Sequence, residues 1–121
     1  MGSTSSYDIY EKINRLLTAI LSVKTLRALD VSKNNFHPEN VMCLMRHAAS
    51  SAENLEILIL ASLDSLNDET APSLIEMIRN KPSLKQLNIA GCTKLSSSTM
   101  NNIVASLIKS NNIKELDFSK C

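Results

Sequence analysis

Leucine and isoleucine recur along this chain at a fixed spacing. Leu26, Leu55, Leu84 and Ile113 each open a segment that reads L-x-x-L-x-L or a close variant, and these residues are 29 positions apart. Alternation of apolar and polar residues over such short stretches predicts β-strands. The segments at 26–31, 55–60, 84–89 and 113–118 are therefore predicted strands. Their inward residues are Leu29, Leu58, Leu87 and Leu116, followed by Val31, Leu60, Ile89 and Phe118.

Apolar residues at helical spacing fill the intervals between these strands. They predict helices that begin at Ser6, at Pro38, at about Ala71 and just after Ser96, which is a good N-cap residue. Pro72 would block a hydrogen bond inside a longer helix, so Thr70 is predicted to cap a late start. The four apolar helix faces are Ile13, Leu16, Leu17 and Ile20; Val41, Leu44, Met45 and Ala48; Ala71, Leu74, Ile75 and Ile78; and Met100, Ile103, Val104 and Leu107.

This period of strand, loop and helix resembles the leucine-rich repeat proteins, in particular the ribonuclease-inhibitor-like subclass with its 29-residue repeats. The resemblance runs from about Tyr7 to Cys121. It implies an α/β fold, a right-handed β-α solenoid with a parallel four-stranded sheet on the concave face and helices on the convex face. Residues 1–5 are predicted to be a polar leader or tag. Residues 6–121 are predicted to be a single domain of about four repeats, part of a longer solenoid.

Composition and charge bear mainly on function. The chain is 44% hydrophobic but only 3% aromatic, so its core must be built from leucine, isoleucine, valine and methionine. Its 13 basic and 12 acidic residues give no electrostatic case for binding nucleic acid or a membrane surface. No stretch predicts a transmembrane helix or a signal peptide. We therefore expect a cytoplasmic protein with a protein partner.

The residues capable of chemistry favour structural roles. Cys92 and Cys121 take the place that Asn34 has in its own unit, where the resemblance implies a side chain bonded to loop backbone. Neighbouring strands would bring the two cysteines about 5 Å apart, which leaves a disulfide open, although a cytoplasmic setting favours thiols. His37, a predicted cap, and His47 lack metal-ligand spacing, and no glycine-rich phosphate loop is present. We expect no enzyme activity, no metal and no cofactor.

The outward strand positions are the candidate binding residues, because alternate residues of a strand face opposite sides. In the family that the chain resembles, these columns line the concave face where partners dock. Ile57 and Ile59 are unusual there because they are apolar. They form either a docking patch or a pair of exposed isoleucines tolerated for their β-propensity. The candidates are Ala28, Asp30, Ile57, Ile59, Gln86, Asn88, Glu115 and Asp117.

These patterns predict a non-catalytic protein–protein interaction module, or scaffold, that holds its partner on the concave sheet. One alternative is a structural segment that self-assembles, because both terminal strands would have unpaired edges. The copies would then stack head to tail or pair edge to edge as a homo-oligomer. The other alternative, implied by the resemblance, is a regulator of the actin-capping or GTPase-activating type.

Overall fold

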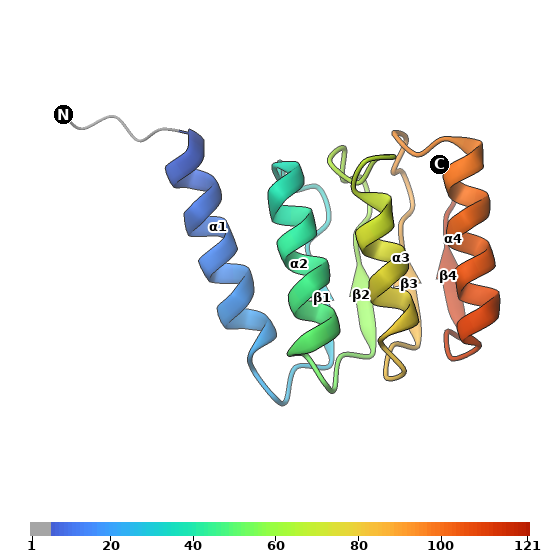
Figure 1. Cartoon of the computed structure of the whole chain (residues 1–121), viewed down its shortest axis with the longest axis horizontal. Helices are drawn as coiled ribbons and strands as arrows, with labels where there is room; N and C mark the ends of the chain where they lie inside the picture. Colours follow the sequence, from blue (N-terminus) through green and yellow to red (C-terminus); the bar gives the residue numbers. More distant parts are fainter. Residues whose placement is uncertain (1–5) are drawn as a thin grey trace.

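Helices and strands alternate along the chain and separate into two layers, as the computed structural model of residues 6–121 shows (Figure 1). The helices stand side by side in one layer, and the strands form a four-stranded parallel sheet in the other. The predicted α/β class and sheet are confirmed. The predicted leader at residues 1–5 lies outside the described residues, and continuation into a longer solenoid stays a prediction. The elements are α1 (Ser6–Leu21), β1 (Ala28–Asp30), α2 (Pro38–Ser50), β2 (Ile57–Ile59), α3 (Ala71–Arg79), β3 (Gln86–Asn88), α4 (Ser97–Ser110) and β4 (Glu115–Asp117).

The strands pair in chain order, and every residue faces the residue 29 positions along the chain. Leu29, Leu58, Leu87 and Leu116 stand in one such row across the sheet. Each strand has three residues, fewer than the predicted six: two predicted residues precede it and one follows it. The backbone turns after each strand. The turn passes through a left-handed residue at the same place in each unit, and these residues are Lys33, Ser62, Gly91 and Lys120.

The helix starts follow the sequence prediction, with one difference in mechanism. Pro38 lies in the first turn of α2, behind an N-cap at His37 whose Nδ1 accepts a hydrogen bond from the Glu39 N–H at 3.1 Å. The Ser96 hydroxyl caps α4 by accepting from the Thr99 N–H at 3.2 Å. Helix α3 begins at Ala71 as predicted, but the Thr70 hydroxyl instead donates to the Ser65 carbonyl at 2.7 Å. None of the four helices in residues 6–121 has the length and hydrophobicity needed to cross a lipid bilayer.

The core lies between the two layers and is best covered in the middle of the row of units. Leu58 and Leu87 are fully buried, whereas Leu29 and Leu116, on the outer strands, are only half-buried. Phe118, predicted as an inward residue of the last strand segment, is 49% exposed and is not part of the buried core. The reason is that no further unit within the described residues covers the outer side of β4.

Side chains also tie each unit to the one before it. The Cys92 thiol donates to the Leu60 carbonyl at 3.2 Å, and the Cys121 thiol donates to the Ile89 carbonyl at 3.1 Å. Both cysteines are free thiols, so the structural role predicted for them is confirmed and the disulfide is not formed. Asn34, whose strand is the first within residues 6–121, instead donates to the Val31 carbonyl in its own unit at 2.8 Å. At the other ends of the strands, Asn54, Ser83 and Asn112 each bond a carbonyl of the preceding unit.

Truncation of the inward leucines should destabilise the fold according to position. We expect Leu58→Ala or Leu87→Ala to lower the free energy of unfolding by about 2–5 kcal/mol, because each leaves a cavity in a fully buried site. Leu116→Ala, at a half-buried position, should cost less. Urea unfolding of the three variants measures this order, and equal losses at all three positions would contradict the burial described above.

Candidate functional site

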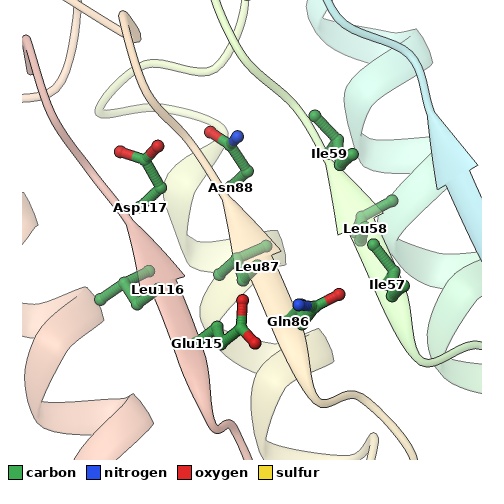
Figure 2. Close-up of a pocket in the computed structure, with 9 residues that line it drawn as sticks. All are labelled: Ile57, Leu58, Ile59, Gln86, Leu87, Asn88, Glu115, Leu116 and Asp117. Carbon is green, nitrogen blue, oxygen red and sulfur yellow. The ribbon is translucent and has the colours of Figure 1, made fainter.

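A shallow hollow crosses the outward side of the sheet over β2, β3 and β4 (Figure 2). We call it the strand-face hollow, and its volume is about 250 Å³. Six of the eight predicted binding residues line it, together with the leucine at the centre of each strand. Ala28 and Asp30, the other two candidates, lie on β1 beside the hollow and are exposed. The residues of the hollow are Ile57, Leu58, Ile59, Gln86, Leu87, Asn88, Glu115, Leu116 and Asp117.

Ile57 and Ile59 give the hollow its apolar side. Both are half-buried by their neighbours in the sheet rather than fully exposed. Ile59 stands between Asp30 on β1 and Asn88 on β3, the residues paired with it in register. Glu115 and Asp117 on β4 form the opposite wall (Figure 2). The apolar strip therefore lies between Asp30, beside the hollow, and the carboxylates of Glu115 and Asp117 within it.

Asp30, Asn88 and Asp117 occupy the same strand position as Ile59 in the other units. These polar residues have a structural role that the sequence pattern does not reveal. Each accepts a hydrogen bond from the backbone N–H two residues further on, which holds the turn after its strand. For Asp30 the donor is the Ser32 N–H at 2.9 Å, for Asn88 it is the Ala90 N–H at 2.9 Å, and for Asp117 it is the Ser119 N–H at 3.0 Å.

Isoleucine cannot accept such a bond, and the chain compensates from the neighbouring strand. The Ala61 N–H, two residues after Ile59, donates to the Ser32 hydroxyl oxygen at 3.0 Å. A buried or half-buried N–H without a partner would be costly, so Ser32 permits an apolar residue at position 59. The apolar strip is thus built into the hydrogen bonding of the sheet and is more than an isolated exposed side chain.

Hydrogen bonding lowers the pKa of two flanking carboxylates, Asp30 and Asp117. The Ser32 hydroxyl, and after it the Ser32 N–H, lowers the pKa of Asp30 below its ordinary value. The backbone N–H of Ser119, and after it the Ser119 hydroxyl at 2.7 Å, lowers the pKa of Asp117 in the same way. Both residues therefore carry negative charge at neutral pH.

Basic residues border the opposite ends of the same strands. One residue directly precedes each strand, and parallel pairing places these four residues in a row where the strands begin. They are Arg27, Glu56, Lys85 and Lys114. Arg27 and Glu56 form an ion pair in which Nη1 and Oε2 are 2.8 Å apart. Three of these four residues are basic, whereas two of the four residues that end the strands, Asp30 and Asp117, are acidic.

The two histidines lie at the start of α2 and within it. His37 caps α2, and its ring contacts the ring of Tyr10, with the ring centroids 4.1 Å apart. His47 is half-buried on α2. Within residues 6–121, no group of three or more His, Cys, Asp or Glu side chains is placed to hold a metal ion.

The sequence reasoning missed two features of the helix layer. A groove of about 660 Å³ runs between α2 and α3, with Met42, Met45 and Met77 among its lining residues. Lys81 is buried, and its ammonium group donates to the Ala52 carbonyl one unit earlier. Met42 and Met77 lie outside the predicted apolar helix faces, and they were the available sequence signal for the groove. No pattern marks a buried lysine, because lysine is an ordinary surface residue.

Two of the solved structures that match this chain show what it is similar to. The leiomodin-1 actin-binding site 2 matches 97% of this chain and 64% of its own chain, with a TM-score of 0.75 and 14% sequence identity. The tropomodulin C-terminal domain of Caenorhabditis elegans matches 91% of this chain and 82% of its own, with a TM-score of 0.61 and 16% identity. This chain thus spans less than two thirds of the leiomodin chain. At such identities the likeness establishes the fold alone.

Sequence comparison adds nothing to these matches: no family model and no curated protein matches the chain. The predicted membership of the ribonuclease-inhibitor-like subclass is wrong, because the matching structures are the leiomodin and tropomodulin domains. The physical reason is that the leucine spacing reports only that strands alternate with helices over a packed core. Domains of more than one family meet that requirement.

The compensation by Ser32 can be tested with a double-mutant cycle. Ser32→Ala removes the acceptor for the Ala61 N–H, and we expect it to lower the free energy of unfolding by about 1 kcal/mol. An asparagine at position 59 would accept that N–H, as Asn88 does in its own unit. Adding Ile59→Asn to Ser32→Ala should therefore recover most of the loss in urea unfolding. Additive losses from the two substitutions would contradict this account.

The two turn carboxylates should make stability depend on acidic pH. Their folded pKa values lie below the ordinary value of 3.8. The stability that they contribute is therefore present above about pH 4 and is lost as the pH falls through the folded pKa. In urea unfolding between about pH 5 and pH 2, the double variant Asp30→Asn, Asp117→Asn should lose less stability than the wild type. Asparagine still accepts the turn hydrogen bond, so parallel pH profiles would contradict the assignment.

Proposed function

We propose that this chain is a non-catalytic actin-binding module that regulates actin. The observation that carries the proposal is the overlap of nearly the whole chain, 97% at a TM-score of 0.75, with a leiomodin domain described as an actin-binding site. The resemblance found in the sequence implied an actin-capping regulator as one alternative. We propose that alternative in place of the interaction module whose partner was not specified. Nothing in either structural match favours GTPase activation. A cytoplasmic location fits a protein that meets actin.

The proposed contact surface is the strand-face hollow with its flanking residues Ala28 and Asp30. An apolar strip between carboxylates suits a partner surface that presents an apolar side chain next to basic ones. A sheet of four strands spans only about 15 Å, whereas a standard interface covers about 800 Å² per partner. We therefore propose that the hollow anchors a contact that is weak when the module acts alone. We also propose that the units form a right-handed solenoid with this face on its concave side.

Charge disfavours the other alternative, head-to-tail self-assembly. If β4 of one copy continued the sheet beside β1 of another, the 29-residue register would place Asp117 opposite Asp30. It would also place Lys114 beside Arg27. Like charges directly opposite each other on neighbouring strands are destabilising. The terminal strands thus oppose stacking of identical copies.

The actin proposal is tested by replacing Ile59 with a polar residue. Ile59→Asn should weaken binding to actin at least about tenfold, as the loss of an apolar anchor at the centre of an interface does. Asparagine is preferred to aspartate because Asp30 is the direct neighbour on β1. Co-sedimentation with actin filaments and native electrophoresis with actin monomers measure the two forms of the partner.

Ile108→Asn provides the matched control. Ile108 lies on α4 and is 73% exposed, so the same chemical change occurs away from the strand face. This variant should bind as the wild type does, and thermal unfolding should show both variants folded. Absence of binding by the wild type to both filaments and monomers would reject actin as the partner. Binding that survives Ile59→Asn would move the contact away from the hollow.

A further inference from the structure

The groove between α2 and α3 is a second concave surface, and neither end of the sequence creates it. Helix α2 packs between α1 and α3, and α3 packs between α2 and α4 (Figure 1). The groove is lined by residues of α2 and α3 alone and has a volume of about 660 Å³. It shares no residue with the strand-face hollow, which lies in the other layer.

Apolar side chains form the floor of this groove. Met45 and Met77 line it and are buried, and Met42 and Ala49 line it and are half-buried. Met42, Met45 and Ala49 follow one another at positions i, i+3 and i+7, so they lie along one side of α2. Methionine side chains are flexible and adapt to the shape of an apolar group packed against them. The floor is therefore suited to receive apolar side chains.

The repeat itself does not require an apolar floor between neighbouring helices. A second hollow lies between α3 and α4, and its lining residues are Arg79, Ser106, Lys109 and Ser110. Ser106 stands 29 positions after Met77, so a serine takes the place of the methionine in the next unit. The apolar floor is thus particular to the pair α2 and α3.

Two side chains of opposite charge border the floor. Arg46 of α2 and Glu76 of α3 both line the groove and are exposed. The ion pairs of residues 6–121 join other residues, so these two charges do not neutralise each other across the groove. The Asn80 side chain donates to Glu76 Oε1 at 3.0 Å. The Arg46 guanidinium has no acceptor within the described residues and is available to an acidic group.

We propose that the groove between α2 and α3 is a docking site for an amphipathic helix of a partner protein. A helix can present an apolar stripe at i, i+3, i+4 and i+7 with charged residues on both flanks. The stripe would pack on the methionine floor. An acidic residue on one flank would pair with Arg46, and a basic residue on the other flank would pair with Glu76. The α2 wall extends from Met42 to Ser50, about 12 Å, which matches two turns of such a helix.

This docking site is independent of the proposed contact with actin. The groove lies in the helix layer and the strand-face hollow in the sheet, so one partner on each layer would not compete for the same residues. The segment at residues 1–5, Met-Gly-Ser-Thr-Ser, has no acidic side chain that could pair with Arg46. The occupant that fits the charges is therefore a separate helix.

Two designed peptides test the charge pattern with the whole chain. Both are helices of about 18 residues, rich in alanine, with leucines along one face. The mixed peptide has glutamates on one flank and lysines on the other, and the second peptide has lysines on both flanks. In fluorescence anisotropy, the lysine peptide should bind the wild type at least about threefold more weakly than the mixed peptide does. Arg46→Glu should reverse this order, because both walls of the groove are then acidic.

Variants of the protein locate the site. Met42→Asp should weaken binding of the mixed peptide at least about tenfold, because it places a carboxylate in the apolar floor. Ile108→Asp, on the exposed side of α4, is the matched control and should bind normally. Arg79→Glu makes the same charge change as Arg46→Glu but in the other hollow, so the order of the peptides should stay that of the wild type. If Met42→Asp lowers the thermal midpoint, Ala49→Phe decides, since it fills the floor without adding charge.

Several outcomes would overturn the proposal. These are absence of binding by both peptides, equal binding of the two peptides to the wild type, an unchanged order in Arg46→Glu, and equal losses in Met42→Asp and Ile108→Asp. An oligomer of the wild type in sedimentation that Met42→Asp dissociates would instead assign the groove to a second copy. Actin binding should be the same in Met42→Asp as in the wild type, so failure of this proposal and failure of the actin proposal are distinguishable.

Discussion

Every strand of this protein must find its hydrogen-bonding partner one unit away, and this constraint fixes the arrangement of the rest. The backbone of each strand pairs with residues 29 positions along the chain, which brings the leucines into one row. A unit in the middle of the row is covered on both sides, so Leu58 and Leu87 are fully buried. A unit at either end of residues 6–121 has one neighbour within that range. The exposure of Leu16 (61%) and Phe118 (49%) therefore has the same cause as the burial of the central leucines.

The order of elements could be read from the sequence because periodic leucines report burial directly, but the strand ends could not. The pattern continues through Val31 and its equivalents, whereas the regular strands stop one residue earlier. The turn that follows uses a left-handed residue, which is a glycine only at Gly91. Lysine and serine hold this conformation at the other three positions, although it is unfavourable for residues with a side chain. Surrounding hydrogen bonds, such as that from the Lys33 N–H to the Ala61 carbonyl, compensate and leave no local sequence signal.

The candidate site was predictable in outline for a similar reason. Alternation along a strand places the outward residues on one face, and six of the eight candidates indeed line one hollow. The roles of those residues were not predictable. Asp30, Asn88 and Asp117 resemble binding residues in the sequence, yet each has an oxygen engaged by its own turn. The link between Ser32 and Ala61 joins residues of neighbouring strands, so it emerges only once the register is known.

This division of roles limits how the strand face, as the proposed contact surface, could recognise a partner. A carboxylate held by its own turn keeps its charge but has fixed geometry, so Asp30 and Asp117 can attract a basic partner without reorganising. Apolar contact at the same face falls to Ile57 and Ile59, which have no such hydrogen bond to maintain. Substitution of a carboxylate should therefore act mainly on charge attraction and its salt dependence. Substitution of an isoleucine should act on the close contact itself. The other units have a side chain that accepts the turn hydrogen bond at the position of Ile59. The Ser32 hydroxyl accepts that bond from the Ala61 N–H, and this allows an isoleucine at position 59.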